Sequence, residues 1–166
     1  MKKYLLLIVF IFSSLTIFAQ EDTTTYYLIR HAEKDRTDKS NRNPDLMKKG
    51  HDRAAYWSTV LSNVNFDMVY STKYNRTIQT AKPTADSKKL EIVYYNPSKM
   101  FDDAFQKATK GKTVLVVGHS NTTPFFANKI LGEEKYKQIK DDNNNNLYIV
   151  TVTKGSKTSI LLKVVH

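Results

Sequence analysis

Apolar and polar residues are grouped in blocks along this chain, and the blocks predict strands and helices in turn. Short apolar runs predict four strands, at residues 26–29, 67–70, 90–95 and 113–117. Helical spacing predicts a helix that opens at Pro44-Asp45, one over residues 74–88, a short one ending near residue 110 and one over residues 123–131. A further short helix is expected before residue 141, and residues 147–153 and 158–165 predict a closing hairpin. Alternating strands and helices indicate an α/β fold, a three-layer sandwich with helices flanking a largely parallel central sheet.

Local signals refine two of these helices. The first has an apolar stripe formed by Met47, Ala54, Trp57, Leu61 and Val64. His51 falls off that stripe and is interpreted as an ordinary surface histidine. Before the second helix, Ser71 and Thr72 are natural N-caps, and Pro83 within it predicts a kink or a break.

Polar residues follow three of the predicted strands. Arg30 and His31 end the first, residues 71–76 follow the second, and Gly118-His119 follows the fourth. Ligands of parallel sheets collect at the carboxyl ends of the strands, so these residues are expected to share one crevice. A phosphoryl group would suit them, because arginine binds its oxygens bidentately and a neutral histidine can attack phosphorus. The alternative for Arg30 and His31 is a strand end with two solvated polar residues.

The N-terminus has the layout of a secretory signal peptide. Lys2 and Lys3 precede an apolar run at residues 4–12, and the segment ends at Ala19. We therefore expect residues 1–19 to be removed, leaving one domain of residues 20–166 that is exported to the periplasm or secreted. An uncleaved anchor is the alternative, but the apolar segment is short for a membrane span. No stable membrane insertion is expected after removal.

Composition adds a basic charge and the lack of cysteine. The formal net charge is +10 and falls to +8 without Lys2 and Lys3, while the absence of cysteine excludes disulfides and cysteine-ligated zinc. A basic chain attracts anions, although scattered lysines also serve solubility. The basic loop of residues 34–45 is long enough to lie over a site. We expect a small phosphorylated substrate as the partner and not nucleic acid.

Three motifs, in their order and spacing, carry a resemblance to a known family. They are Leu28-Ile29-Arg30-His31-Ala32-Glu33, then Ser71-Thr72 through Arg76-Thr77-Ile78-Gln79-Thr80-Ala81, then Val117-Gly118-His119-Ser120-Asn121. The chain resembles the histidine phosphatase superfamily, which includes the cofactor-dependent phosphoglycerate mutases. Its Arg-His-Ala-Glu sequence, in place of Arg-His-Gly, resembles that of a variant subgroup.

The resemblance implies a role for each matched residue. His31 would attack phosphorus and form a phosphohistidine, and water would then release phosphate. Arg30 and Arg76 would hold the phosphoryl oxygens, His119 would donate to the same oxygens, and Asn121 would contact the substrate. No metal or cofactor is expected. Hydrolysis is expected rather than mutase activity, because the mature chain leaves little room for the lid insertions that retain a bisphosphate.

The general acid is the main departure from the family pattern. Asp102 and Asp103 stand where many members have an acid, but without a distinctive motif, and helix N-terminal charge is the favoured explanation for them. Without an acid, substrates that have a good leaving group, such as phosphohistidine, would be favoured. The alternative function is a non-catalytic binding module for phosphate or an anionic envelope glycolipid.

Two other chemistries fit the sequence poorly. A metal site from His31, His51 and His119 lacks helical ligand spacing and a clear carboxylate set. Gly118-His119-Ser120-Asn121-Thr122 lacks the final glycine of a serine-hydrolase nucleophile elbow.

Overall fold

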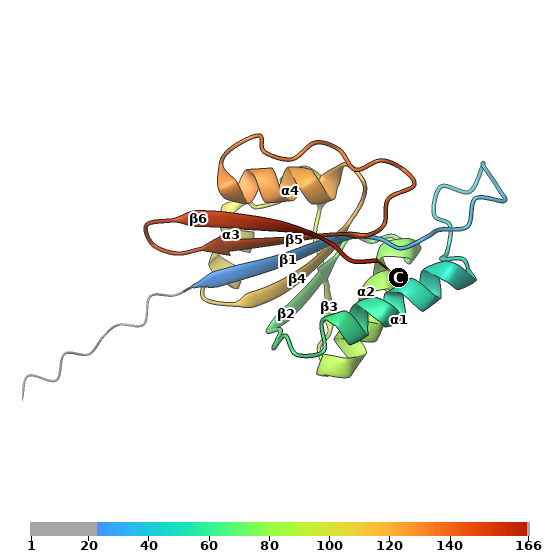
Figure 1. Cartoon of the computed structure of the whole chain (residues 1–166), viewed down its shortest axis with the longest axis horizontal. Coiled ribbons are helices and arrows are strands. Elements are labelled where there is room, and N and C mark those ends of the chain that lie inside the picture. The colour runs from blue at the N-terminus through green and yellow to red at the C-terminus, as the bar shows by residue number, and fades with distance from the viewer. Residues whose placement is uncertain (1–22, 166) are drawn as a thin grey trace, which may run out of the picture.

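A six-stranded mixed sheet forms the centre of the molecule in a computed structural model that describes residues 23–165 (Figure 1). Its strands are β1 Thr24–Arg30, β2 Met68–Ser71, β3 Ile92–Tyr94, β4 Thr113–Gly118, β5 Asn146–Val152 and β6 Lys157–Lys163. Their order is β3-β2-β4-β1-β5-β6, with the first four parallel and the β5–β6 hairpin antiparallel. The predicted largely parallel sheet and closing hairpin are confirmed. The expected signal peptide lies outside the described residues.

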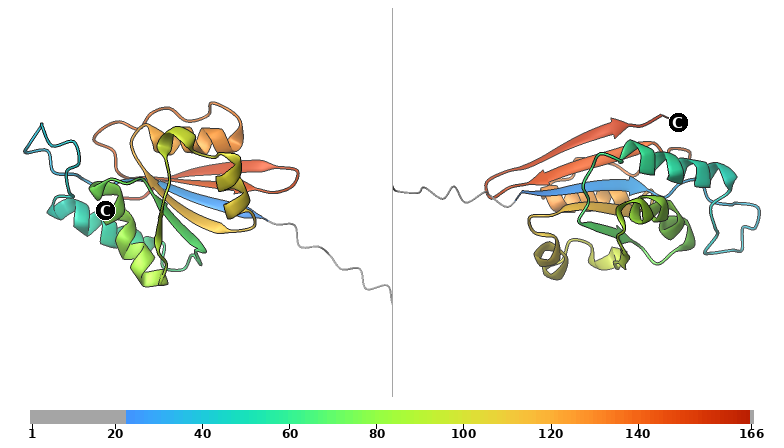
Figure 2. Two further views of the ribbon diagram at one scale, coloured as in Figure 1. Left: turned by 180° about the vertical axis from the view of Figure 1, so that it is seen from behind. Right: turned by 90° about the horizontal axis from the view of Figure 1, so that it is seen from below.

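Helices cover both faces of this sheet. They are α1 Lys48–Val60, α2 Asn75–Lys88, α3 Asp103–Thr109 and α4 Thr122–Leu131, with a short 3₁₀ helix, η1, at Pro97–Lys99. Helices α1 and α2 lie on one face, and α3 and α4 on the other (Figures 1 and 2). The three-layer α/β sandwich is therefore confirmed.

The alternation of side chains along the central strands produces two cores. In β1, Leu28 packs with Phe126 of α4, whereas its neighbour Ile29 packs with Trp57 of α1, and all four are buried. Successive residues of a strand point to opposite faces, so a strand with helices on both sides must be apolar throughout. This explains the continuous Val114–Val117 run of β4, whose four side chains are buried.

Two features of the helices differ from the predictions. Helix α2 continues through Pro83, so the predicted break does not occur, because Ala81 and Ala85 on either side of the proline are buried against the sheet. No helix forms in residues 132–145. There, the buried Asn128 side chain accepts a hydrogen bond from the Tyr136 N–H and donates one to its carbonyl, so side-chain bonds replace a helical turn.

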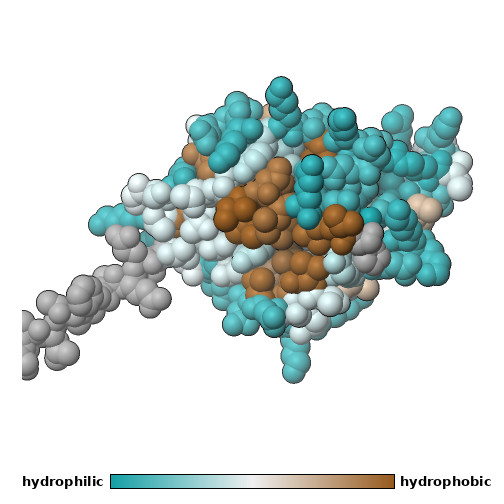
Figure 3. Space-filling view, viewed as in Figure 1, coloured by the Kyte–Doolittle hydropathy of each residue, from teal (hydrophilic) through white to brown (hydrophobic). Residues whose placement is uncertain are grey.

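The hairpin leaves apolar side chains on the surface. Figure 3 shows an apolar area on the face that carries the hairpin, and Ile160, Leu161 and Leu162 of β6 are exposed. Met47, expected on the buried stripe of α1, is instead the exposed residue just before that helix. No helix within residues 23–165 is both long and apolar enough to cross a membrane.

Candidate functional site

The carboxyl ends of β1, β2 and β4 meet at one edge of the sheet. The register pairs Arg30 with Gly118 and Ser71 with Val117, so the residues that follow these strands are neighbours. They surround a cavity of about 350 Å³ whose lining includes Arg30, His31, Arg76, His119, Asn121 and Asp141. The structure thus brings together all five residues predicted for the site.

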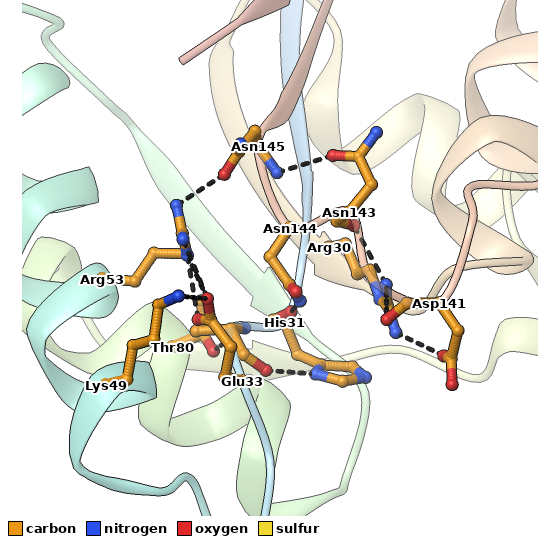
Figure 4. A network of polar contacts seen from close by, with 11 residues as sticks. Arg30, His31, Glu33, Lys49, Arg53, Thr80, Asp141, Asn143, Asn144 and Asn145 are labelled. Carbon is orange, nitrogen blue, oxygen red and sulfur yellow. Dashed lines mark hydrogen bonds and ion pairs between the residues drawn. The ribbon is translucent and has the colours of Figure 1, made fainter. Parts of the chain in front are cut away.

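His31 is held as a neutral imidazole. The side chain is buried, and Nδ1 lies 2.7 Å from the carbonyl oxygen of Ala32 (Figure 4). A carbonyl only accepts, so Nδ1 carries the proton and Nε2 keeps its lone pair. Burial, reinforced by the positive charges of Arg30 and Arg76, lowers the pKa of His31 to about 3, because desolvation and like charges disfavour the imidazolium.

His119 lies beside it and is positioned by hydroxyl groups. The two imidazole rings are 5.5 Å apart between centroids, and His119 Nε2 lies 2.9 Å from Thr72 Oγ1. Burial, with the charges of Arg76 and Arg30, lowers the pKa of His119 to about 4. The prediction that Ser71 and Thr72 cap α2 is wrong. Tyr74 is the N-cap residue and makes no side-chain cap bond, while the Thr72 hydroxyl faces the histidine.

Arg30 is a buried cation with most of its hydrogen-bonding groups engaged. Its Nη1 donates to the carbonyl oxygens of Lys140, Asp141 and Asn143 at 2.9–3.0 Å. Its Nη2 donates to Asp141 Oδ1 at 2.8 Å. The Nε atom is buried and has no partner within the described part of the chain. The guanidinium is thus anchored through its Nη atoms, and its Nε–H is an unused donor within the described residues.

Arg76 presents a second donor of the same kind. It lies in the first turn of α2, and its guanidinium carbon is 4.5 Å from the centroid of the Tyr74 ring. Its Nε is also buried without a hydrogen-bond partner among residues 23–165. Leaving a buried donor unsatisfied costs about 1–3 kcal/mol, and more when the group is charged. Two such donors in the wall of one cavity favour the binding of an anion there.

A supporting network fixes the backbone around His31, and sequence reasoning missed it. Asn144 donates to the His31 carbonyl at 2.8 Å, and Thr80 accepts from the Ala32 N–H at 2.9 Å. Glu33 forms a bidentate ion pair with Arg53, whose Nη1 donates to Asn145 (Figure 4). The four-asparagine run was the signal available for this loop, but its pairing partners are distant in sequence.

Asp102 and Asp103 take no part in this cavity. Asp102 caps α3 by accepting from the Phe105 N–H at 2.9 Å, and it lines a different cavity. Asp103 lies in the first turn of α3. The helix N-terminus therefore accounts for both acids.

The exposed His51 lies on α1, apart from the cavity lining, as expected for a surface histidine. Within the described residues, no cluster of three or more histidine, aspartate or glutamate side chains is arranged to hold a metal ion.

Comparisons with known proteins agree with this arrangement. Residues 26–96 match the sequence model of the histidine phosphatase superfamily (branch 1). The search of curated proteins found no match.

Three solved structures illustrate the shared fold. The phosphoglycerate mutase of Bacillus anthracis is 15% identical, with a TM-score of 0.66, over 86% of this chain and 93% of its own. The alpha-ribazole phosphatase of Shigella flexneri is 14% identical, with a TM-score of 0.63, over 84% and 96%. The phosphoserine phosphatase of Entamoeba histolytica is 15% identical, with a TM-score of 0.61, over 82% and 94%.

At these identities, the structural likeness establishes the fold alone. The matched segment contains Arg30, His31 and Arg76, three of the residues that line the cavity. Over residues 26–96 the chain is therefore similar to the histidine phosphatase superfamily, and its fold is that of the three solved structures.

Proposed function

We propose that this chain is a phosphatase that hydrolyses phosphate esters or phosphoramidates through a covalent phosphohistidine on His31. One observation carries the proposal. Two buried arginine Nε–H groups, those of Arg30 and Arg76, have no hydrogen-bond partner within residues 23–165, and both arginines line a cavity that also contains a neutral histidine. A phosphoryl group would satisfy both donors and present phosphorus to His31 Nε2.

The remaining residues have roles that follow from their contacts. The Nδ1–H bond to Ala32 keeps Nε2 of His31 unprotonated, as attack on phosphorus requires. The Thr72 hydroxyl, by donating to His119 Nε2, would leave the other ring nitrogen to carry a proton toward a phosphoryl oxygen. Asn121 lies on the cavity wall and would contact the substrate. Fixed donors of this kind stabilise the charge that shifts among phosphoryl oxygens.

The Arg-His-Ala-Glu sequence is part of the proposal. Glu33 is paired with Arg53 and cannot serve as a free base, and its ion pair ties the segment after His31 to α1. We infer that Ala32, in place of the usual glycine, makes the backbone after His31 more rigid. The alpha-ribazole phosphatase and phosphoserine phosphatase with this fold support a small phosphorylated substrate.

Replacement of His31 by alanine tests the phosphatase directly. We expect p-nitrophenyl phosphate hydrolysis by residues 20–166 to be abolished in His31→Ala, because no other group in the cavity would form the covalent intermediate. His51→Ala, which removes an exposed histidine of α1, is the matched control and should retain full turnover. Acid-quenched wild-type protein should carry an acid-labile phosphoryl group on His31.

The same experiment addresses the two alternatives. Phosphate binding without turnover of either p-nitrophenyl phosphate or phosphoramidate would contradict the proposal and support the non-catalytic binding module. Transfer of the phosphoryl group to an added phosphomonoester, rather than to water, would indicate mutase activity. We expect release of inorganic phosphate alone.

A further inference from the structure

Asp141 is the acidic residue in direct contact with the proposed phosphoryl-binding arginine. Its Oδ1 accepts from Arg30 Nη2 at 2.8 Å, and its Oδ2 accepts from Arg36 Nη1 at 3.0 Å. The side chain is 70% exposed, so it stands at the rim of the cavity rather than in the core. The carboxylate therefore lies within hydrogen-bonding distance of Arg30, one of the two arginines proposed to hold the phosphoryl group.

His31 lines two adjoining cavities, and in the one that also contains Arg76 and His119 no other carboxylate among the described residues is part of the lining. Glu33 is held by Arg53 and lines only the adjoining cavity. Asp142, next in sequence, also lines only that adjoining cavity. Asp102 caps α3 elsewhere. Asp141 lines both cavities, together with Arg30, His31 and Lys34.

We propose that Asp141 donates the proton to the leaving-group oxygen and then accepts one from the attacking water. The proposal rests on the proposed phosphatase function and supplies the general acid that the sequence left unassigned. In the first step, the His31 Nε2–phosphorus bond forms and the ester P–O bond breaks. The electron pair goes to the leaving oxygen, which takes the carboxyl proton of Asp141.

The second step returns His31 and Asp141 to their states in the substrate complex. Water attacks phosphorus, the bond to His31 Nε2 breaks with its electron pair returning to the nitrogen, and the proton lost by water goes to the Asp141 carboxylate. Phosphate is the product. One residue therefore acts as acid and then as base, and the protons balance over the cycle.

Substrate binding would raise the pKa of Asp141, so that it takes up the proton that this role requires. In the free protein, the hydrogen bond and charge of Arg36, together with Arg30, hold the pKa of Asp141 below its ordinary value, so it is ionised. A phosphoryl dianion on Arg30 would stand beside this carboxylate and share its cation. A neighbouring like charge raises a carboxyl pKa, so binding would draw a proton onto Asp141.

The test compares two leaving groups in Asp141→Asn, which keeps the size of the side chain and an oxygen for Arg30. p-Nitrophenolate leaves without a proton, whereas the alkoxide of glycerol 2-phosphate needs one. General acid catalysis contributes roughly 10²–10⁴-fold. We therefore expect the ratio of kcat/KM for p-nitrophenyl phosphate to that for glycerol 2-phosphate to rise by about 10²–10⁴-fold in the variant.

Asp142→Asn is the matched control and should leave this ratio unchanged. An unchanged ratio in Asp141→Asn, with both substrates slowed equally or neither slowed, would overturn the assignment. Failure of the phosphatase proposal itself gives a different result, because wild-type protein would then hydrolyse neither substrate. A change of ratio in the Asp102→Asn variant, and not in Asp141→Asn, would place the acid on α3 instead.

Discussion

His31 owes its neutral state to its surroundings rather than to its residue type. It is buried beside two arginines and a second histidine, and its Nδ1–H donates a hydrogen bond to the Ala32 carbonyl. Each of these features disfavours the imidazolium or fixes the tautomer. An imidazole held in this way remains unprotonated in acid solution, in contrast to an exposed histidine.

This burial predicts that the protein loses stability as the pH falls below 7. The pKa of His31 is about 3 in the folded protein and about 6.5 in the unfolded chain, so the unfolded state binds more protons between these values. The free energy of unfolding should therefore decrease from pH 7 to pH 5, where unfolded carboxyl groups are still largely ionised. His119 adds to the slope, with a folded pKa of about 4.

Urea unfolding at pH 7, 6 and 5 measures this slope. A variant with His31→Ala and His119→Ala lacks both buried imidazoles and should show a much flatter dependence, whatever its absolute stability. An identical slope in wild type and variant would contradict the burial of neutral histidines.

At this scale, the sequence was sufficient for the residues that face the cavity. Arg30, His31, Arg76 and His119 stand next to strand ends or in a helix first turn, and such positions can be recognised from local pattern. Thr72 and Asn144 were not recognised, because each bonds a residue at least 47 positions away in the chain. Pairings at that separation depend on sheet order, which local pattern does not determine.

At the scale of elements, the close approach of α1 to the segment after β1 sets the shape of the site. Gly50 is buried in the first turn of α1, and a Cβ there would collide with the carbonyl oxygen of Glu33. That carbonyl also accepts the Met47 N–H at 3.0 Å, and the Glu33 side chain is paired with Arg53. A glycine is therefore required for the helix to dock here.

Gly50→Ala is expected to destabilise the protein despite the better helix propensity of alanine. Alanine gains about 1 kcal/mol in a helix interior, but a collision with backbone costs typically 1–3 kcal/mol and here also displaces Glu33. The net loss of unfolding free energy should be about 1–2 kcal/mol, measured by urea denaturation. Gly155→Ala, at a hairpin position with open space around it, is the control and should change stability little. Equal effects at both positions would refute the packing explanation.

The strands were predictable because each is a short apolar run, and all four runs identified in the first part of the chain became parallel strands. The segment of residues 132–145 was not, because its backbone is organised by Asn128 and by Arg30 rather than by local propensity. The break predicted at Pro83 does not occur for a related reason. Burial of its neighbours outweighs the local preference against a helix.

For the whole molecule, we propose export with removal of residues 1–19, on the basis of the basic, apolar and small-residue layout at the start of the chain. Expression of the full chain in a Gram-negative host should give a periplasmic or secreted protein whose intact mass and N-terminal sequence correspond to a start near Gln20. Lys2→Glu with Lys3→Glu should reduce export. Full-length protein retained in the cytoplasm would contradict the proposal.

Strand β1 begins at Thr24 and ends beside His31, so the first described strand spans the sheet from one end to the other (Figure 1). At about 3.3 Å per residue, the two ends are roughly 20 Å apart. A solid support or fluorescent label joined ahead of Thr24 would therefore be on the side opposite the cavity. An immobilised form attached in this way would present its cavity to the solution, which makes that end the natural choice for a phosphate biosensor.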